Sequence, residues 1–201
     1  MISLIENDSG YHVRADLFSI SFLNKKGSVQ QNCEDLLTLK QVHSSLIISD
    51  PQGSLEGDGI LIGDLIKKGG IYTADCIPFA ILGSKKLVLL HCGWRGIKDQ
   101  IILKGLESLG ERPRMCLVGP CARRCCYEVK RDFLDLISTS AHFKFHNQQI
   151  FFDLVGYACD FLPKEIPVFD LRICTICNTN WHSYRRQKTK MNNLTVARLV
   201  D

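Results

Sequence analysis

Three residues in the first half of the chain are of types that bind metal ions or take part in nucleophilic chemistry. His43 lies in a stretch of alternating apolar and polar residues, Cys76 follows Ala-Asp in the segment at 73–78, and His91 ends an apolar run. Side chains at the ends of strands project into clefts, while the sheet fixes their positions. We therefore expect His43, Cys76 and His91 to converge on one site.

Two histidines and a cysteine allow more than one chemistry. They supply three ligands for a catalytic zinc ion and leave the fourth tetrahedral position open for water or substrate. They could also act without a metal, with Cys76 as a thiolate nucleophile and a histidine as its base. Histidines at strand ends are commonly structural, so the spacing leaves all three interpretations open. Asp75, the neighbour of Cys76, is a candidate hydrogen-bond acceptor or proton carrier.

Two segments place arginines where an anion could bind. Gly-Trp-Arg-Gly at 93–96 opens an expected helix, whose unpaired amides and dipole favour an anion beside Arg95. Tyr184 is followed by Arg185 and Arg186, and planar arginine side chains bind phosphate through charge-assisted hydrogen bonds. The alternatives are a tight turn at 93–96 and a solvated charged surface at 183–186.

The chain holds ten cysteines, among them the Cys174 and Cys177 pair and the upstream Cys121, Cys125 and Cys126. A lone Cys-x-x-Cys pair without a second pair at finger or ribbon spacing is more typical of unpaired thiols than of structural zinc. A redox role is also disfavoured, because the motif follows an expected strand and does not open a helix. The sequence therefore favours unpaired thiols over a second metal site here.

The elements that must position these residues follow from the apolar pattern. It predicts strands at 16–22, 42–48, 70–72, 79–82, 87–90, 115–118 and 168–173. Helices are expected at 97–109, 128–138 and 153–162, with a further helix from Asn32 to near Lys40. Strands occur both in adjacent groups and singly between helices, and no linker interrupts the chain. We expect an α+β fold: a single domain, 1–201, with a large mixed sheet and helices packed on its faces.

Composition narrows the possible partners. The 201 residues are 45% hydrophobic, and 25 basic against 21 acidic residues give a net charge of +4. This balance argues against a nucleic-acid partner but leaves enough arginines for a small anion. The N-terminus has no basic segment leading into an apolar one, and no apolar run approaches membrane-spanning length. We expect a cytoplasmic protein with no membrane partner.

Taken in order, these motifs resemble the laccase-domain proteins, once called polyphenol oxidases and since recognised as purine nucleoside phosphorylases. The similarity covers most of the chain and keeps the family's order. The shared segments are Lys-Gln-Val-His at 40–43, Gly-Asp-Gly at 57–59, 73–78, 91–96, Gly-Pro-Cys at 119–121, Cys-Tyr-Glu-Val at 126–129, Cys-Thr at 174–175 and Ser-Tyr-Arg-Arg at 183–186.

The resemblance implies that His43, Cys76 and His91 form the active site and bind zinc. It also implies phosphorolysis of adenosine, inosine, guanosine or methylthioadenosine, with adenosine deamination as a further activity in which zinc would activate water. The partners would be a purine nucleoside and phosphate. The substrate contacts are then expected from residues that carry positive charge or an aromatic ring: Arg95, Tyr184, Arg185 and Arg186.

The chain departs from the family at several polar positions. A Ser-Thr-Arg-Gly-Gly-like turn is replaced by residues 21–27, which removes an expected arginine, and Lys190 and Met191 stand where Gly-Arg is usual. Arg123 and Arg124 replace Gly-Pro, and His182 replaces an aromatic residue. A shift in substrate choice is expected from these changes.

Three other functions stay open. One is a metal-free cysteine hydrolase or amidase using Cys76 and a histidine, and another is a nucleoside-binding regulator without catalysis. The third, a copper polyphenol oxidase, is disfavoured because the six histidines form no His-x-His pairs.

Overall fold

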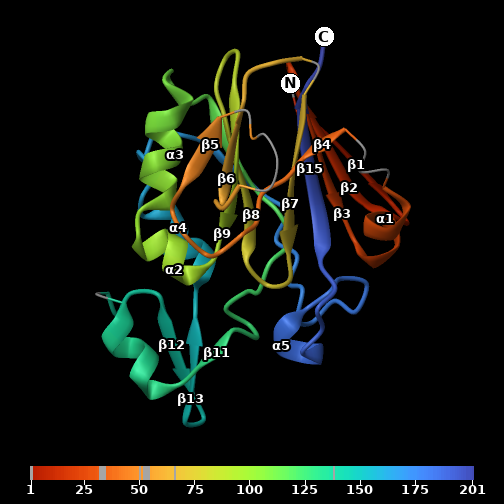
Figure 1. Ribbon diagram of the computed structural model, residues 1–201. Coiled ribbons are helices and arrows are strands. Elements are labelled where there is room, and N and C mark those ends of the chain that lie inside the picture. The colour runs from red at the N-terminus through yellow and green to blue at the C-terminus, as the bar shows by residue number, and fades with distance from the viewer. Residues whose placement is uncertain (1, 32–34, 50, 52–54, 66, 138) are drawn as a thin grey trace.

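The computed structural model describes residues 2–31, 35–49, 51, 55–65, 67–137 and 139–201. Helices, a central sheet and an outer sheet form three layers (Figure 1). Both termini lie at one end of the layers, and a small third sheet with a short helix lies at the other end (Figure 1). The α+β class expected from the sequence is confirmed, and its sheet component consists of two large mixed sheets.

The central sheet has the strand order β14-β10-β8-β9-β6-β5. Its pairs are antiparallel except β10 with β14 and β5 with β6, which are parallel. The strands are β5 (Ile47–Ser49), β6 (Gly59–Ile62), β8 (Ile77–Leu82), β9 (Leu87–Cys92), β10 (Met115–Val118) and β14 (Val168–Asp170).

The two middle strands of this sheet, β8 and β9, are fully buried because both faces are covered. Alternate residues of β8 divide between two cores. Phe79 and Ile81 pack with the helices, whereas Ala80 and Leu82 pack against the outer sheet. This burial explains why these strands appear in the sequence as continuous apolar runs.

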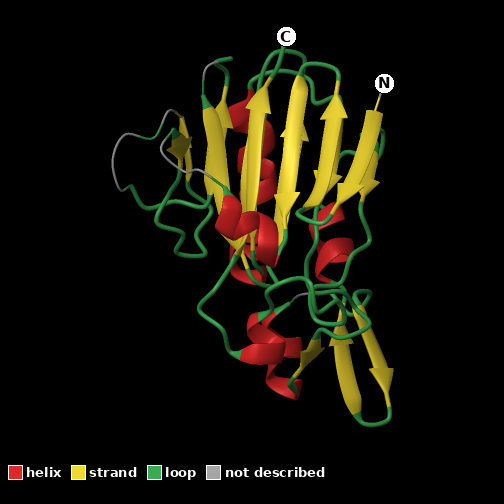
Figure 2. Ribbon diagram, turned by 90° about the vertical axis from the view of Figure 1, so that its right-hand side faces the viewer, coloured by secondary structure: helices red, strands yellow, loops and turns green. Residues whose placement is uncertain are grey.

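The outer sheet has the order β1-β2-β3-β15-β7-β4 and is seen face-on in Figure 2. Only its β4–β7 pair is parallel. The C-terminal strand lies in its interior, between β3 and β7. The strands are β1 (Ile2–Asn7), β2 (Gly10–Ala15), β3 (Phe18–Leu23), β4 (Leu36–Leu37), β7 (Lys68–Thr73) and β15 (Asn193–Leu199).

Three helices cover the outward face of the central sheet: α2 (Trp94–Lys98), α3 (Ile101–Leu109) and α4 (Leu154–Cys159). The small third sheet joins β11 (Glu128–Val129), β13 (Gln149–Phe152) and β12 (Phe143–His146). The remaining helical turns are α1 (Lys25–Gln30), the 3₁₀ helix η1 (Arg131–Leu136) and α5 (Tyr184–Gln187). Among the described residues, no helix is long and apolar enough to cross a membrane.

Several element predictions are confirmed, with small shifts of their ends. The strand at 115–118 matches β10, the strands at 70–72, 79–82 and 87–90 lie within β7, β8 and β9, and 16–22 overlaps β3. The helix at 97–109 ends at Gly110 as expected, but Gln100, at φ 67°, breaks it into α2 and α3. The helix at 153–162 is α4, and the Asp153 side chain accepts a hydrogen bond from Gly156 N at 3.0 Å.

Other element predictions are wrong. Only the end of the expected 42–48 strand is extended, because Val42, His43 and Ser44 donate their backbone hydrogen bonds to a side chain. The first residues of the expected 128–138 helix pair with β13, and Arg131–Leu136 form η1. Asn32 lies outside the described residues, and the described part of the expected helix holds β4.

Candidate active site

The three side chains predicted to converge come together at the end of the central sheet. His43 lies in the segment before β5, Cys76 in the bend between β7 and β8, and His91 near the end of β9. Cys76 Sγ is 3.7 Å from His43 Nε2, and the potential ligand atoms of the three residues lie within 4.8 Å of one another. These three donors can hold a metal ion.

Asp58, directly before β6, holds two members of this site in place. The side chain is fully buried. Oδ1 accepts hydrogen bonds from His43 N at 3.0 Å and from His91 Nδ1 at 2.7 Å. Oδ2 accepts from Val42 N at 3.2 Å, Ser44 N at 2.6 Å and Ser44 Oγ at 2.8 Å. The carboxylate therefore fixes both the backbone at His43 and the orientation of the His91 ring.

Sequence reasoning missed Asp58, although it included the Gly-Asp-Gly segment among the shared motifs. An acidic residue between glycines, directly before an apolar strand, is the signal that points to a buried carboxylate. Burial acts to raise the pKa of Asp58, but the hydrogen bonds from His91 and Ser44 outweigh it and lower the pKa to about 2. Asp58 is thus ionised at neutral pH and favours a proton on His91 Nδ1, which leaves Nε2 available as a ligand.

Cys76 and His91 strongly affect each other's ionisation. Burial acts to raise the pKa of the Cys76 thiol, but the charge of His91 and hydrogen bonds with His43 and His91 lower it to about 6. Burial acts to lower the pKa of His91, but the Cys76 thiolate and Asp58 raise it to about 9. In the absence of a metal, the two side chains therefore form a thiolate–imidazolium pair at neutral pH.

The backbone is strained at two positions of the site. His43 has φ 61° and Asp75 has φ 92°, values that cost a non-glycine residue free energy. Asp58 holds the strained backbone at His43 by accepting a hydrogen bond from His43 N. At the second, Asp75 Oδ1 accepts from Thr175 Oγ1 and Oδ2 accepts from Arg185 N, each at 2.7 Å. The Asp75 carboxylate therefore joins the loop at Thr175 to the segment that carries Arg185, and both its oxygens are engaged in these bonds.

Glycine at position 93 allows the close packing of His43 and Cys76. A Cβ atom there would lie 2.9 Å from His43 Cδ2 and 3.1 Å from Cys76 Sγ. The first distance is shorter than real Cβ contacts, so a larger residue would displace His43 or Cys76. The backbone is extended at Gly93, which means that space and not conformation requires the glycine.

The three donors line a cavity of about 710 Å³. Arg95, Tyr184 and Arg185 line the same cavity, as do residues that the sequence analysis did not select as ligands: Gln41, Tyr72, Trp94, Tyr127, Thr189, Lys190 and Asn192. Among these, Lys190 adds a cation at the position where the family's Gly-Arg is replaced.

The two arginines of the cavity rest on aromatic rings. The Arg95 guanidinium lies 4.4 Å from the centre of the Trp94 ring, and that of Arg185 lies 4.0 Å from the centre of the Tyr127 ring. Arg185 also donates a hydrogen bond to the carbonyl of Glu128. Stacking of this kind orients a guanidinium without neutralising its charge, so both cations can bind an anion in the cavity.

Arg186, expected as a substrate contact, is directed away from the cavity. Its guanidinium donates hydrogen bonds to the carbonyls of Thr175 at 2.5 Å, Ile176 at 2.8 Å, Asn178 at 3.2 Å and Trp181 at 2.5 Å. These bonds tie α5 to the loop that follows β14. These contacts fit a structural role for Arg186, which holds this loop in place.

The fold and the cavity define a class of α+β protein with a histidine–cysteine–histidine site at the end of a sheet. The sequence pattern of the family described as "Multi-copper polyphenol oxidoreductase laccase" matches residues 10–197. The chain belongs to this family. The resemblance inferred from the motifs is therefore confirmed.

Relatives of the chain carry a more specific name. A protein of Aquifex aeolicus named purine nucleoside phosphorylase is 38% identical over 156 residues, which cover 74% of each chain. One of Borreliella burgdorferi with the same name is 31% identical over 179 residues, covering 80% of this chain and 78% of the relative.

Solved structures share the fold at lower sequence identity. The hypothetical protein YfiH of Bacillus licheniformis has a TM-score of 0.83 at 15% identity, covering 100% of this chain and 99% of that one. YlmD of Geobacillus stearothermophilus has a TM-score of 0.77 at 15% identity, covering 98% and 99%. At this sequence identity, these similarities support the assignment of the fold and nothing about activity.

Proposed function

We propose that this chain is a zinc-dependent purine nucleoside phosphorylase that acts on adenosine, inosine, guanosine or methylthioadenosine, with adenosine deamination as a second activity. The observation that carries the proposal is the single cavity in which His43, Cys76 and His91 face Arg95 and Arg185. The names of the relatives agree with it. Phosphate and a purine nucleoside are then the substrates.

The donor set fits zinc. Cys76 Sγ, His43 Nε2 and His91 Nε2 are three donors of the kind zinc prefers, and Asp58 supplies the carboxylate that usually orients a ligating histidine. Multicopper centres need more imidazoles than the two that line this cavity. When bound, zinc would act as a Lewis acid that polarises an oxygen of a reactant or activates water.

Phosphorolysis breaks one bond and forms another. A phosphate oxygen bonds to C1′ of the sugar, the C1′–N9 bond breaks, and its electron pair leaves with the purine, which gains the proton that the hydrogen phosphate loses. The products are a sugar 1-phosphate and the free base. Positive charge develops on the sugar during this step, so a correctly placed phosphate dianion stabilises it.

The chain's own residues account for binding and orientation. In our proposal Arg95, Arg185 and Lys190 hold the phosphate through charge-assisted hydrogen bonds, while the rings of Tyr72 and Tyr184 pack on the base or sugar. Arg186 positions Arg185 by tying α5 to the neighbouring loop and does not itself contact phosphate. In deamination, water replaces phosphate as the nucleophile, so the arginines matter less for that reaction. The reduced thiolate that the site requires is consistent with the cytoplasm as its compartment.

A second candidate, a metal-free cysteine hydrolase or amidase, is favoured by one observation. Cys76 and His91 form a thiolate–imidazolium pair when no metal is bound, as in cysteine hydrolases. A hydrolase of this kind would be active after metal removal and would be inactivated by alkylation of Cys76. The phosphorylase requires the opposite result on metal removal.

The test follows free base by chromatography from adenosine, inosine, guanosine and methylthioadenosine, with and without phosphate. Base release that needs both phosphate and zinc supports the phosphorylase, and inosine formed from adenosine supports the deaminase. Arg95→Ala and Arg185→Ala should each lower kcat/KM for phosphate by about 10- to 100-fold, because each removes charge-assisted hydrogen bonds.

Arg112→Ala is the matched control, because this exposed arginine does not line the cavity. Adenosine deamination measured on the same samples should fall less than phosphorolysis in the Arg95 and Arg185 variants. Equal losses of both reactions in folded, zinc-loaded variants would contradict the assignment of these arginines to phosphate.

A further inference from the structure

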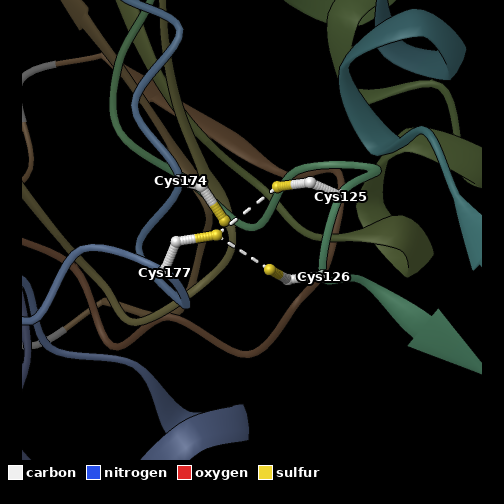
Figure 3. Close-up of side chains that lie close together, drawn as sticks. All are labelled: Cys125, Cys126, Cys174 and Cys177. Atoms are coloured by element: carbon white, nitrogen blue, oxygen red, sulfur yellow. Dashed lines mark hydrogen bonds between the residues drawn. The ribbon is translucent and has the colours of Figure 1, made fainter.

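Four cysteines outside the active site come together from two loops (Figure 3). Cys125 and Cys126 lie between β10 and β11, and Cys174 and Cys177 lie between β14 and α5. Cys177 Sγ is 3.6 Å from Cys125 Sγ and 2.8 Å from Cys126 Sγ. All four sulfur atoms lie within 4.8 Å of one another. A role as scattered, unrelated thiols is not consistent with this arrangement.

The spacing of the sulfur atoms fits a tetrahedral metal centre. With a zinc–sulfur bond of about 2.3 Å, the sulfurs of a four-thiolate site lie about 3.8 Å apart, whereas a disulfide needs about 2.0 Å. The separation between Cys125 and Cys177 matches the first value. The separation between Cys126 and Cys177 falls between the two values, so the experiment must test for this disulfide.

We propose that Cys125, Cys126, Cys174 and Cys177 form a second, structural zinc site. The site is closed, with four thiolates and no open position, in contrast to the three-donor set in the cavity. Binding would replace the thiol protons, release them to solvent and give a centre of net negative charge. The Arg186 guanidinium donates hydrogen bonds to the carbonyls of Thr175 and Ile176, which lie between Cys174 and Cys177 in the sequence, and so holds the loop that carries these two ligands.

The position of the cluster indicates what a bound ion would do. Cys126 is followed by Tyr127, whose ring supports Arg185, and Cys174 is followed by Thr175, which donates its hydroxyl hydrogen bond to Asp75. One ion would therefore join the two loops that support Arg185 in the cavity wall, one through Tyr127 and the other through Thr175 and Asp75. This effect on the cavity rests on the proposed function, whereas binding of the ion does not.

The experiment measures metal bound to purified full-length chain under reducing conditions. Wild-type protein should hold about two zinc ions, and Cys76→Ala and Cys125→Ser/Cys177→Ser should each hold about one. Cys159→Ser is the matched control, since Cys159 is a free, partly buried cysteine outside both groups, and it should keep the wild-type content. Cobalt loaded into Cys76→Ala should give the intense visible absorption of tetrahedral thiolate coordination.

Several outcomes would overturn the proposal. They are a cluster variant with wild-type zinc content, a Cys76→Ala variant without zinc, iron with labile sulfide in place of zinc, and a disulfide between Cys126 and Cys177 in the freshly purified protein. If the Cys125→Ser/Cys177→Ser variant does not fold, the zinc content of Cys76→Ala still decides whether the cluster binds zinc. Failure of the proposed function is distinguishable, because a protein with zinc at the cluster and no phosphorolysis would refute only the phosphorylase.

A kinetic readout separates a structural ion from an incidental one. Loss of zinc from the cluster should raise KM for phosphate more than it lowers kcat, because the ion would hold Tyr127 beneath Arg185 and not touch the reacting atoms. Addition of zinc to the cluster variant should not restore the wild-type KM. An unchanged KM in a folded variant that has lost this zinc would contradict a role for the ion in shaping the cavity.

Discussion

Replacement of Asp58 by asparagine tests how the active site is held together. The carboxylate accepts five hydrogen bonds, two at Oδ1 and three at Oδ2. Asparagine keeps one accepting oxygen and replaces the other with an NH₂ group that can only donate. Whichever way the amide turns, at least two donors lose their acceptor. If the NH₂ group faces His91 Nδ1, it favours a proton on Nε2, the atom needed for a metal.

The magnitude can be worked from the pKa of Asp58. The shift from an unfolded value of about 3.9 to about 2 corresponds to about 2 to 3 kcal/mol of stability at pH 7. A buried donor left without a partner costs a further 1 to 3 kcal/mol, roughly. We expect Asp58→Asn to lose about 3 to 6 kcal/mol of unfolding free energy and about 10- to 100-fold in zinc affinity.

The pH dependence follows from the direction of the shift. Because the pKa of Asp58 is lower in the folded state, its contribution is complete above pH 5, roughly, and is lost as the pH falls toward 2. The difference in stability between wild type and Asp58→Asn should therefore shrink below pH 4, roughly. Urea unfolding of metal-free protein at several pH values measures it, and competition with a chromogenic chelator measures zinc affinity.

Glu111→Gln provides the matched control. The Glu111 carboxylate also accepts several hydrogen bonds, from Ser84, Lys85 and Lys86, in a turn outside the cavity. This variant should lose some stability but keep wild-type zinc affinity. Unchanged zinc affinity in Asp58→Asn would refute the reasoning that Asp58 orients His91, and a stability loss as small as that of a surface substitution would refute the magnitude.

Three further predictions concern individual residues. In metal-free protein, alkylation of Cys76 by iodoacetamide should follow a titration with a midpoint near pH 6, since the thiolate forms as the pH rises through its lowered pKa; a midpoint near 9 would contradict the pairing with His91. Gly93→Ala should weaken zinc binding without unfolding the chain, because its Cβ displaces His43 or Cys76; chelator competition and circular dichroism check this, and unchanged affinity would count against it. Arg186→Ala should destabilise the fold by several kcal/mol, roughly, because four carbonyls lose their donor, and the loss should appear in urea unfolding; a purely kinetic defect at wild-type stability would instead indicate a substrate contact.

The sequence was sufficient to predict the convergence of the three donors, because two of them adjoin strands whose burial is evident from composition. Cys76 directly precedes β8 and His91 lies near the end of β9, and the pairing of these strands brings the two residues to the same edge. The third position, His43, was predicted for the wrong reason. It was assigned to a strand, but its backbone has positive φ and is held by a carboxylate that local pattern does not reveal.

The grouping of Cys125, Cys126, Cys174 and Cys177 could not be predicted from the sequence, for a different reason. Zinc motifs are recognised by short spacings within one segment, whereas these ligands come from two loops separated by the small third sheet and α4. Their proximity depends on β14 pairing with β10, a contact between distant parts of the chain. The same limit explains why a helix was wrongly expected at 128–138. The apolar residues there have helical spacing, but Glu128 and Val129 pair with β13.

The interior position of β15 has a consequence for the order in which the molecule can form. Asn193, its first residue, accepts a hydrogen bond from His182 N at 2.8 Å and donates to the carbonyl of Thr73 at 3.1 Å, so it joins β7 to the segment before α5. On the ribosome, β3 and β7 emerge long before this partner and expose unpaired edges until it arrives. The two halves of the outer sheet can therefore join only when β15 is inserted between β3 and β7.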